Sequence, residues 1–192
     1  MLGKSHAAIF ALLICALLTS LPAHALTAPK RDHLTEQEVE LVREAQALDK
    51  RTDVFIRAAE RRLQAIGGTA AAATSSKQAQ KDADKWGPLP KGTRAELLGD
   101  FAKILDEAIN NIDDVAARDT KNPLVPKALR KLASAVNNFL PQISSMRSQS
   151  RDGEELSALE DALENMQQIK EAANRLPPPS EKKDKDKKEK SE

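Results

Sequence analysis

The sequence predicts an all-α fold, an antiparallel helical bundle, from three observations. Apolar side chains recur at steps of three and four residues in four stretches, which is the spacing of one helix face. Three of these stretches begin with a capping residue followed three positions later by glutamate, a helix-start signature. Aromatic residues make up only 3% of the chain, and the other apolar residues, mostly Leu, Ala, Ile and Val, suit closely packed helices.

Residues 1–25 have the layout of a secretory signal peptide. Lys4 precedes an apolar run over residues 7–18, and the small-x-small triplet AHA ends at Ala25. This order predicts cleavage after Ala25, so that the mature chain begins at Leu26. The apolar run covers about 18 Å as a helix, short of the roughly 30 Å hydrocarbon core of a bilayer. We therefore expect an exported protein, periplasmic or extracellular, without stable membrane insertion.

The composition of residues 26–192 argues against several classes of function. This part of the chain has no cysteine and no tyrosine, and its one histidine, His33, precedes the first predicted helix. A Ser–His–Asp or Cys–His group, a C-x-x-C-H haem motif and a Glu-x-x-His iron site therefore cannot be assembled from the usual parts. The net charge of this part is zero, because Lys4 accounts for the +1 of the whole chain, so we expect no nucleic-acid binding. We also expect no enzyme activity, no cofactor and no metal.

After a short linker over residues 26–34, one long amphipathic helix is predicted over residues 35–66. Thr35 is a natural N-cap, and Glu38 completes a capping box. Gly67 and the glycine that follows it end the helix. The apolar stripe of this helix consists of Leu41, Ala45, Leu48, Thr52, Phe55, Ala59, Leu63 and Ile66.

The charges near the ends of this helix are predicted to stabilise it. Glu36, Glu38 and Glu40 lie near the positive N-terminal end of the helix dipole. Arg61 and Arg62 lie near its negative C-terminal end. These charges are therefore interpreted as structural and not as a binding site.

Two segments differ in composition from the predicted helices. Residues 67–92 hold few apolar side chains before the turn WGPLPKG, although Lys77, Lys81 and Lys85 would share one helix face. A connection of this length is unusual inside a compact domain, so we predict a flexible crossover that closes in that turn. Residues 177–192 begin with three prolines and continue with interleaved lysines and acids, which predicts a disordered tail.

Residues 93–176 are predicted to form a three-helix unit. Its first helix starts at a capping box of Thr93 and Glu96, and its last starts near Asp152, again with glutamate three residues on. Pro141 is expected to kink the helix between them, because proline removes an N–H and crowds the preceding turn. The short links make the three helices antiparallel neighbours. We expect the core to include Phe55, Leu105, Phe139 and Leu163.

The stripe of helix 35–66 must be buried, either as a fourth helix of the bundle, which we favour, or against another subunit. The long crossover would let this helix leave the bundle and offer its apolar side chains to a partner's groove. We therefore predict a non-catalytic protein–protein interaction module of the cell envelope: a scaffold, an adaptor or a chaperone-like protein. The candidate partner-facing residues are Leu41, Leu48, Phe55 and Leu63.

Three alternatives stay open. Asp106, Asn110 and Asp113 share one helix edge, which a carboxylate-based hydrolase or a cation-binding protein could use. We favour surface ion pairs of Asp113 and Asp114 with the basic start of the next helix: Lys127, Arg130 and Lys131. The second alternative is a purely structural homodimer through helix 35–66. The third is a weak contact of the tail with an anionic envelope polymer.

Processing of the chain provides the first test. N-terminal sequencing of the exported protein should begin at Leu26, because the short apolar run and the AHA triplet predict cleavage after Ala25. A product that retains Met1, or one embedded in the membrane, would contradict this prediction.

Overall fold

The computed structural model describes residues 32–67 and 84–178. These residues form helices and the segments that connect them, with no strand. The all-α prediction is confirmed for this part of the chain. The signal peptide, most of the linker, the middle of the crossover and the tail beyond residue 178 lie outside the described residues. A helical turn occupies residues 84–86. The longer helices are α2 (Glu36–Glu44), α3 (Leu48–Gly67), α5 (Arg94–Arg118), α6 (Leu124–Gln149) and α7 (Gly153–Asn174).

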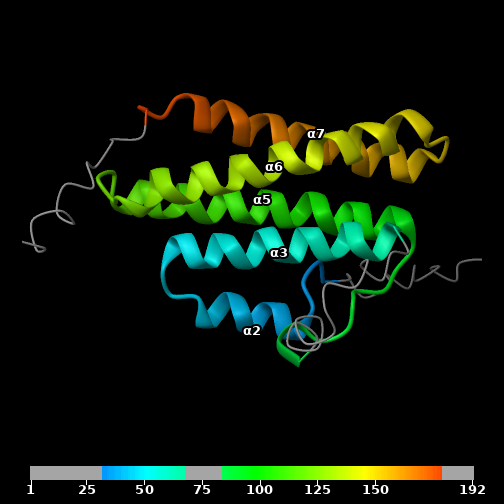
Figure 1. Cartoon of the computed structure of the whole chain (residues 1–192), viewed down its shortest axis with the longest axis horizontal. Helices are drawn as coiled ribbons and strands as arrows, with labels where there is room; N and C mark the ends of the chain where they lie inside the picture. The colour runs from blue at the N-terminus through cyan, green and yellow to red at the C-terminus, as the bar shows by residue number, and fades with distance from the viewer. Residues whose placement is uncertain (1–31, 68–83, 179–192) are drawn as a thin grey trace, which may run out of the picture. The chain divides into compact units, whose positions relative to one another are not determined.

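Helices α3, α5, α6 and α7 form the bundle, and α2 lies outside it on α3 (Figure 1). Helices α3 and α6 run in one direction, and α5 and α7 run in the other. Each of α3 and α7 packs on both α5 and α6, whereas α5 and α6 make less contact with each other. The expectation that the short link makes α5 and α6 close neighbours is therefore only partly met, because each of them packs mainly on α3 and α7.

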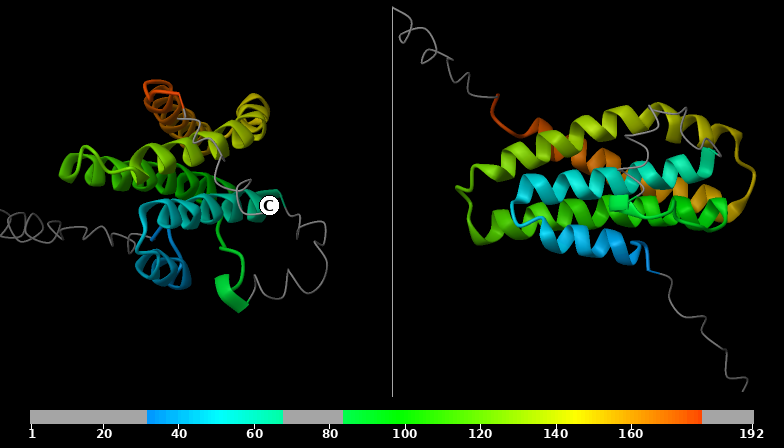
Figure 2. Two further views of the ribbon diagram at one scale, coloured as in Figure 1. Left: turned by 60° about the vertical axis from the view of Figure 1, so that its left-hand side comes forward. Right: turned by 60° about the horizontal axis from the view of Figure 1, so that its bottom comes forward.

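The predicted single helix over residues 35–66 is wrong, because the chain breaks it between α2 and α3. Ala45 leaves the helical conformation with ψ of 81°, and α2 folds back along α3 (Figure 2). Arg51 of α3 donates from Nε to the Ala45 carbonyl at 3.1 Å, which satisfies an acceptor that the break exposes. The break contains neither glycine nor proline, so local propensity does not cause it. The contacts that α2 makes with α3 do.

The predicted helix starts are largely confirmed. Thr35 and Thr93 each accept a hydrogen bond from the N–H three residues on, and the glutamate there accepts from the N–H of the threonine. At α7 the Asp152 side chain accepts from the Glu155 N–H at 2.9 Å. The Glu155 carboxylate instead accepts from the Ser150 hydroxyl, and that hydroxyl oxygen accepts from the Asp152 N–H. Ser150 therefore links the Glu155 carboxylate to the Asp152 N–H, in place of the direct hydrogen bond that a capping box would have.

The core follows the predicted apolar faces closely. Phe55, Leu105 and Phe139 are buried, and Leu163 is half-buried against the core. Helix α6 continues through Pro141, which is exposed on its outer side. None of the helices among residues 32–67 and 84–178 has the length and apolar character needed to cross a membrane.

Ion pairs join α6 to the start of α3 and not to the end of α5. Lys127 Nζ lies 2.6 Å from Asp49 Oδ2, and Lys131 Nζ lies 2.6 Å from Asp53 Oδ2. The hydrogen bond from Lys127 lowers the pKa of Asp49 below its ordinary value, although burial acts in the opposite direction. Asp114 pairs within its own helix with Arg118. The expected pairs of Asp113 and Asp114 with α6 are therefore not found, because α3 supplies closer acids.

The aromatic contact between α5 and α6 tests the packing. The rings of Phe101 and Phe139 lie 5.5 Å apart between centroids, edge to face at 76°. Phe101 is fully buried, so Phe101→Ala should lower the free energy of unfolding by about 3–5 kcal/mol. Urea unfolding would measure it, with Ser134→Ala on the exposed face of α6 as the control. A loss below about 1 kcal/mol would mean that the core has been misassigned.

Candidate interaction surface

The four candidate partner-facing residues are largely buried within the chain itself. Leu41, Leu48, Phe55 and Leu63 expose at most 9% of their surface. Leu41 belongs to α2 and the other three belong to α3. Leu48, Phe55 and Leu63 pack in the core and are not available to a partner while α3 stays in the bundle, whereas Leu41 is largely buried but lines a surface groove.

A buried cluster of three charged side chains, Glu38, Arg61 and Arg62, holds α2 on α3. Glu38 is fully buried, and its Oε1 accepts from Arg61 Nε at 3.1 Å and from Arg62 Nη1 at 2.5 Å. Its Oε2 accepts from the Thr35 N–H at 2.9 Å. One carboxylate therefore caps α2 and binds both arginines of α3 at once.

Arg61 also fixes the chain that enters α5. Its Nη2 donates to the carbonyls of Trp86, Gly87 and Pro88 at 3.0, 3.2 and 2.5 Å. The guanidinium carbon lies 5.8 Å from the centroid of the Trp86 ring, within cation–π range. Gly87 has a φ of 66°, and a Cβ there would meet Gln37 of α2 at 3.2 Å. Glycine is needed at this position for the backbone conformation that brings successive carbonyls to one guanidinium.

Arg62 fixes the chain that enters α2. Its Nη2 donates to the His33 carbonyl at 2.5 Å, and its Nη1 also donates to the Ala58 carbonyl within α3. His33 Nε2 in turn lies 2.6 Å from Glu107 Oε2 of α5. The Nε of Arg62 is buried without a hydrogen-bond partner among the described atoms. The buried cluster therefore fixes the start of α2 and the turn at 86–88 at the cost of one unsatisfied donor.

The charges of the buried cluster shift the ionisation of its members. Burial raises the pKa of Glu38, but hydrogen bonds from Arg62 and the Thr35 N–H, with the charges of both arginines, outweigh burial. The net result is a pKa below the ordinary value of 4.5. Burial lowers the pKa of Arg61, and the Glu38 carboxylate counters only part of this effect. Glu38 is therefore held as a carboxylate.

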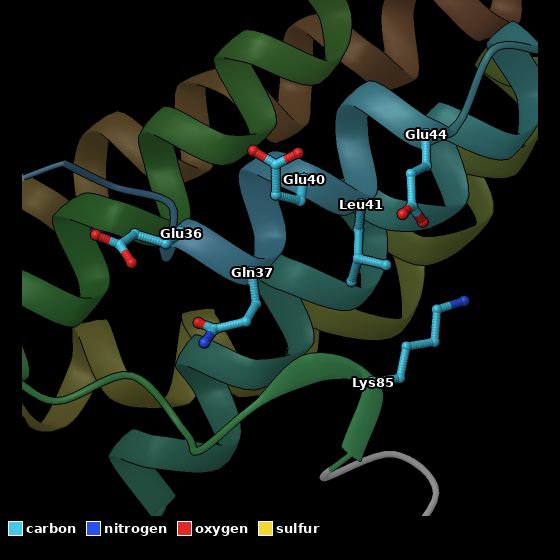
Figure 3. Close-up of a pocket in the computed structure, with 6 residues that line it drawn as sticks. All are labelled: Glu36, Gln37, Glu40, Leu41, Glu44 and Lys85. Atoms are coloured by element: carbon cyan, nitrogen blue, oxygen red, sulfur yellow. The ribbon is translucent and has the colours of Figure 1, made fainter.

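A groove opens along α2 beside this cluster, and we call it the α2 groove (Figure 3). One part has a volume of about 470 Å³ and is lined by Glu36, Gln37, Glu40, Leu41, Glu44 and Lys85. The adjoining part, of about 380 Å³, shares three of these residues and adds Ala45, Lys50, Asp53, Val54 and Trp86. Gln37 and Leu41 lie on the side of α2 that faces the chain carrying Lys85.

The α2 groove combines an apolar floor with an acidic edge. Leu41, Val54 and Trp86 supply apolar surface that is buried or half-buried. The acidic edge consists of Glu36, Glu40 and Glu44, which are all exposed at spacings of four residues. Such a surface offers apolar contacts and carboxylate acceptors side by side.

The carboxylates considered for catalysis or cation binding do not form a cluster with others. Asp106 and Asp113 are exposed on α5. Among residues 32–67 and 84–178, no three histidine or acidic side chains gather in a way that could hold a metal ion.

The sequence carried one signal for the buried cluster that the interpretation of the charges missed. Arg62 lies seven residues after Phe55 and four after Ala58, on the face that the apolar stripe buries. An arginine at such a position requires a buried acceptor. The helix dipole does not explain why Arg62 lies on the buried face of α3. It also does not explain why Arg62 requires the buried carboxylate of Glu38. The α2 groove had no comparable signal, because it depends on the fold-back of α2.

Comparison with protein-family models, with curated proteins and with solved structures finds no match to this chain.

The buried cluster predicts a measurable effect of Glu38→Gln. At neutral pH the substitution leaves two buried arginines without their carboxylate, so the free energy of unfolding should fall by about 3 kcal/mol. Glu40→Gln on the exposed face of α2 is the matched control and should change it by less than about 0.5 kcal/mol.

The pH dependence of that effect follows from the lowered pKa of Glu38. Its folded-state pKa lies below 4.5, so its stabilisation is present above about 4.5 and is lost as the pH falls through the folded value. Denaturant unfolding from pH 7 down to about 3 should therefore show a smaller difference between wild type and Glu38→Gln at the acid end. A constant difference over this range would contradict the assignment.

Proposed function

We propose that this chain is an exported, non-catalytic protein–protein interaction module of the cell envelope, acting as a scaffold, adaptor or chaperone-like protein. Its working surface is the α2 groove and not the stripe of helix 35–66. The part of the stripe on α3 packs mainly in the core, whereas Leu41 and Ala45 line the α2 groove beside acidic groups at the surface.

The observation that supports this proposal is the way in which the α2 groove is built. Of the longer helices in the described part of the chain, only α3 packs against α2, and α2 is held there by Glu38, Arg61 and Arg62. Replacing buried charges by apolar residues is often neutral or stabilising, so three of them are a costly means of attaching a nine-residue helix. What they provide is a fixed geometry, because Arg61 positions Trp86 and the turn at 86–88 opposite α2. Preorganised surfaces of this kind favour binding, since less conformational freedom is lost when a partner docks.

Site-specific photocrosslinking in the native envelope tests the proposal. A photoreactive amino acid would replace Glu44 or Lys85, on the two sides of the α2 groove, in the full chain. Matched probes would replace Ser157 and Gln168, which are exposed on α7. Both groove probes should crosslink to one and the same protein, and the α7 probes should not.

Other outcomes would point to other functions. A crosslinked product with twice the mass of the chain would favour the structural homodimer. Equal products from α7 and groove probes, or no product from the groove probes, would contradict the α2 groove as the working surface. Export itself is tested by the N-terminal sequence of the protein.

A further inference from the structure

The acidic edge of the α2 groove is unfavourable for the helix that carries it. Glu36, Glu40 and Glu44 follow one another at i, i+4 and i+8, so like charges are neighbours on one helix face, which destabilises a helix. Glu44 is also the last residue of α2, where the negative end of the helix dipole disfavours an anion. A helix of nine residues has little stability of its own to offset these effects.

Three other acids of α2 and α3, of which Asp53 lines the α2 groove, are paired with basic side chains of neighbouring elements. Glu38 is bound by Arg61 and Arg62. Asp49 and Asp53 are bound by lysines of α6. Electrostatic compensation between elements is thus the rule at this side of the bundle.

The acidic edge departs from that rule. Glu40 pairs with Arg43 of the same helix at 2.5 Å, and both side chains are more than half exposed. Within residues 32–67 and 84–178, no basic side chain of another element forms an ion pair with Glu36 or Glu44. Lys50 and Lys85 line the same groove as Glu44, but neither forms an ion pair with it in the described part of the chain. Among the described residues, the acidic edge therefore lacks the ion pairs with other elements that the acids Glu38, Asp49 and Asp53 make.

We propose that the α2 groove docks a helical segment of a protein partner that carries lysine or arginine at every fourth position beside an aliphatic side chain. Cations at this spacing match the glutamates of α2, which extend over about 12 Å of helix. The aliphatic side chain would contact Leu41 and Val54 on the floor of the groove. This inference rests on the proposed function and specifies the chemistry of the partner.

A designed peptide provides the probe. It is an alanine-based helix of about 15 residues with lysines at every fourth position and one leucine in the next position along the lysine face. The control peptide has the same composition with the lysines distributed around the helix. Fluorescence anisotropy with the full mature chain at low salt measures both affinities. The first peptide should bind more tightly, and its affinity should fall as salt is added.

Two variants of matched charge locate the binding. Glu36→Gln/Glu40→Gln/Glu44→Gln should weaken binding about tenfold, because three exposed ion pairs each contribute about 0.5 kcal/mol. The control is Glu154→Gln/Asp161→Asn/Glu164→Gln on the exposed face of α7, which should bind the peptide like wild type. Circular dichroism should show that the first variant is as stable as wild type or more so, because it removes like-charge neighbours.

The remaining outcomes overturn the inference. Equal binding of the two peptides, or unchanged binding by the α2 variant, would exclude recognition of spaced cations by the acidic edge. The chain also contains Lys77 and Lys81 at the same spacing before Lys85. If the peptide bound only to a Lys77→Glu/Lys81→Glu variant, the occupant would be this chain and not a partner. If the peptide did not bind but the groove probes still crosslinked to one protein, the proposed interaction module would be supported. The proposal that its partner is a basic helical segment would be wrong.

Discussion

The placement of α2 depends on one carboxylate, that of Glu38, and the two arginines it binds. An arginine buried on α3 must find acceptors, because an unpaired charge in the interior is far more costly than a paired one. The carboxylate that both Arg61 and Arg62 bind is that of Glu38, which lies at the start of α2, so α2 begins beside the end of α3. The carbonyls of His33 and of the turn at 86–88 then supply the remaining acceptors. Three segments far apart in the sequence are fixed by a single charged cluster.

This cluster supplies direction where apolar contacts do not. Leu41 of α2 is buried and α2 packs on α3, but apolar contacts have no angular preference and would allow α2 to rotate or slide. Hydrogen bonds to a guanidinium are directional, so the position of α2 is set to within the tolerance of those bonds. The bundle of α3, α5, α6 and α7, in contrast, is held together mainly by apolar side chains. Its core is a cluster of apolar side chains, and the pairs of Lys127 and Lys131 with the buried Asp49 and with Asp53 add to it.

The two parts of the fold therefore have different roles in the proposed function. The bundle is a stable support whose apolar faces are turned inward. The attached α2 and the turn at 86–88 form a rigid surface on one side of it, with the charges of the acidic edge directed to solvent. That separation allows the acidic edge to be unfavourable for its own helix, because the bundle does not depend on it. Binding energy at the α2 groove can thus be gained without a rearrangement of the core.

The sequence by itself determined the helix starts at Thr35, Thr93 and Asp152 and the faces that enter the core, because capping and periodicity are properties of neighbouring residues. It also indicated which common catalytic and haem motifs are lacking. It did not determine the break at Ala45, since that segment consists of good helix formers and nothing local interrupts it. The break, the burial of Arg61 and Arg62, and the α2 groove were decided only by the tertiary structure. Their cause is a contact between residues more than twenty positions apart, whose strength depends on the removal of water by the packed helices.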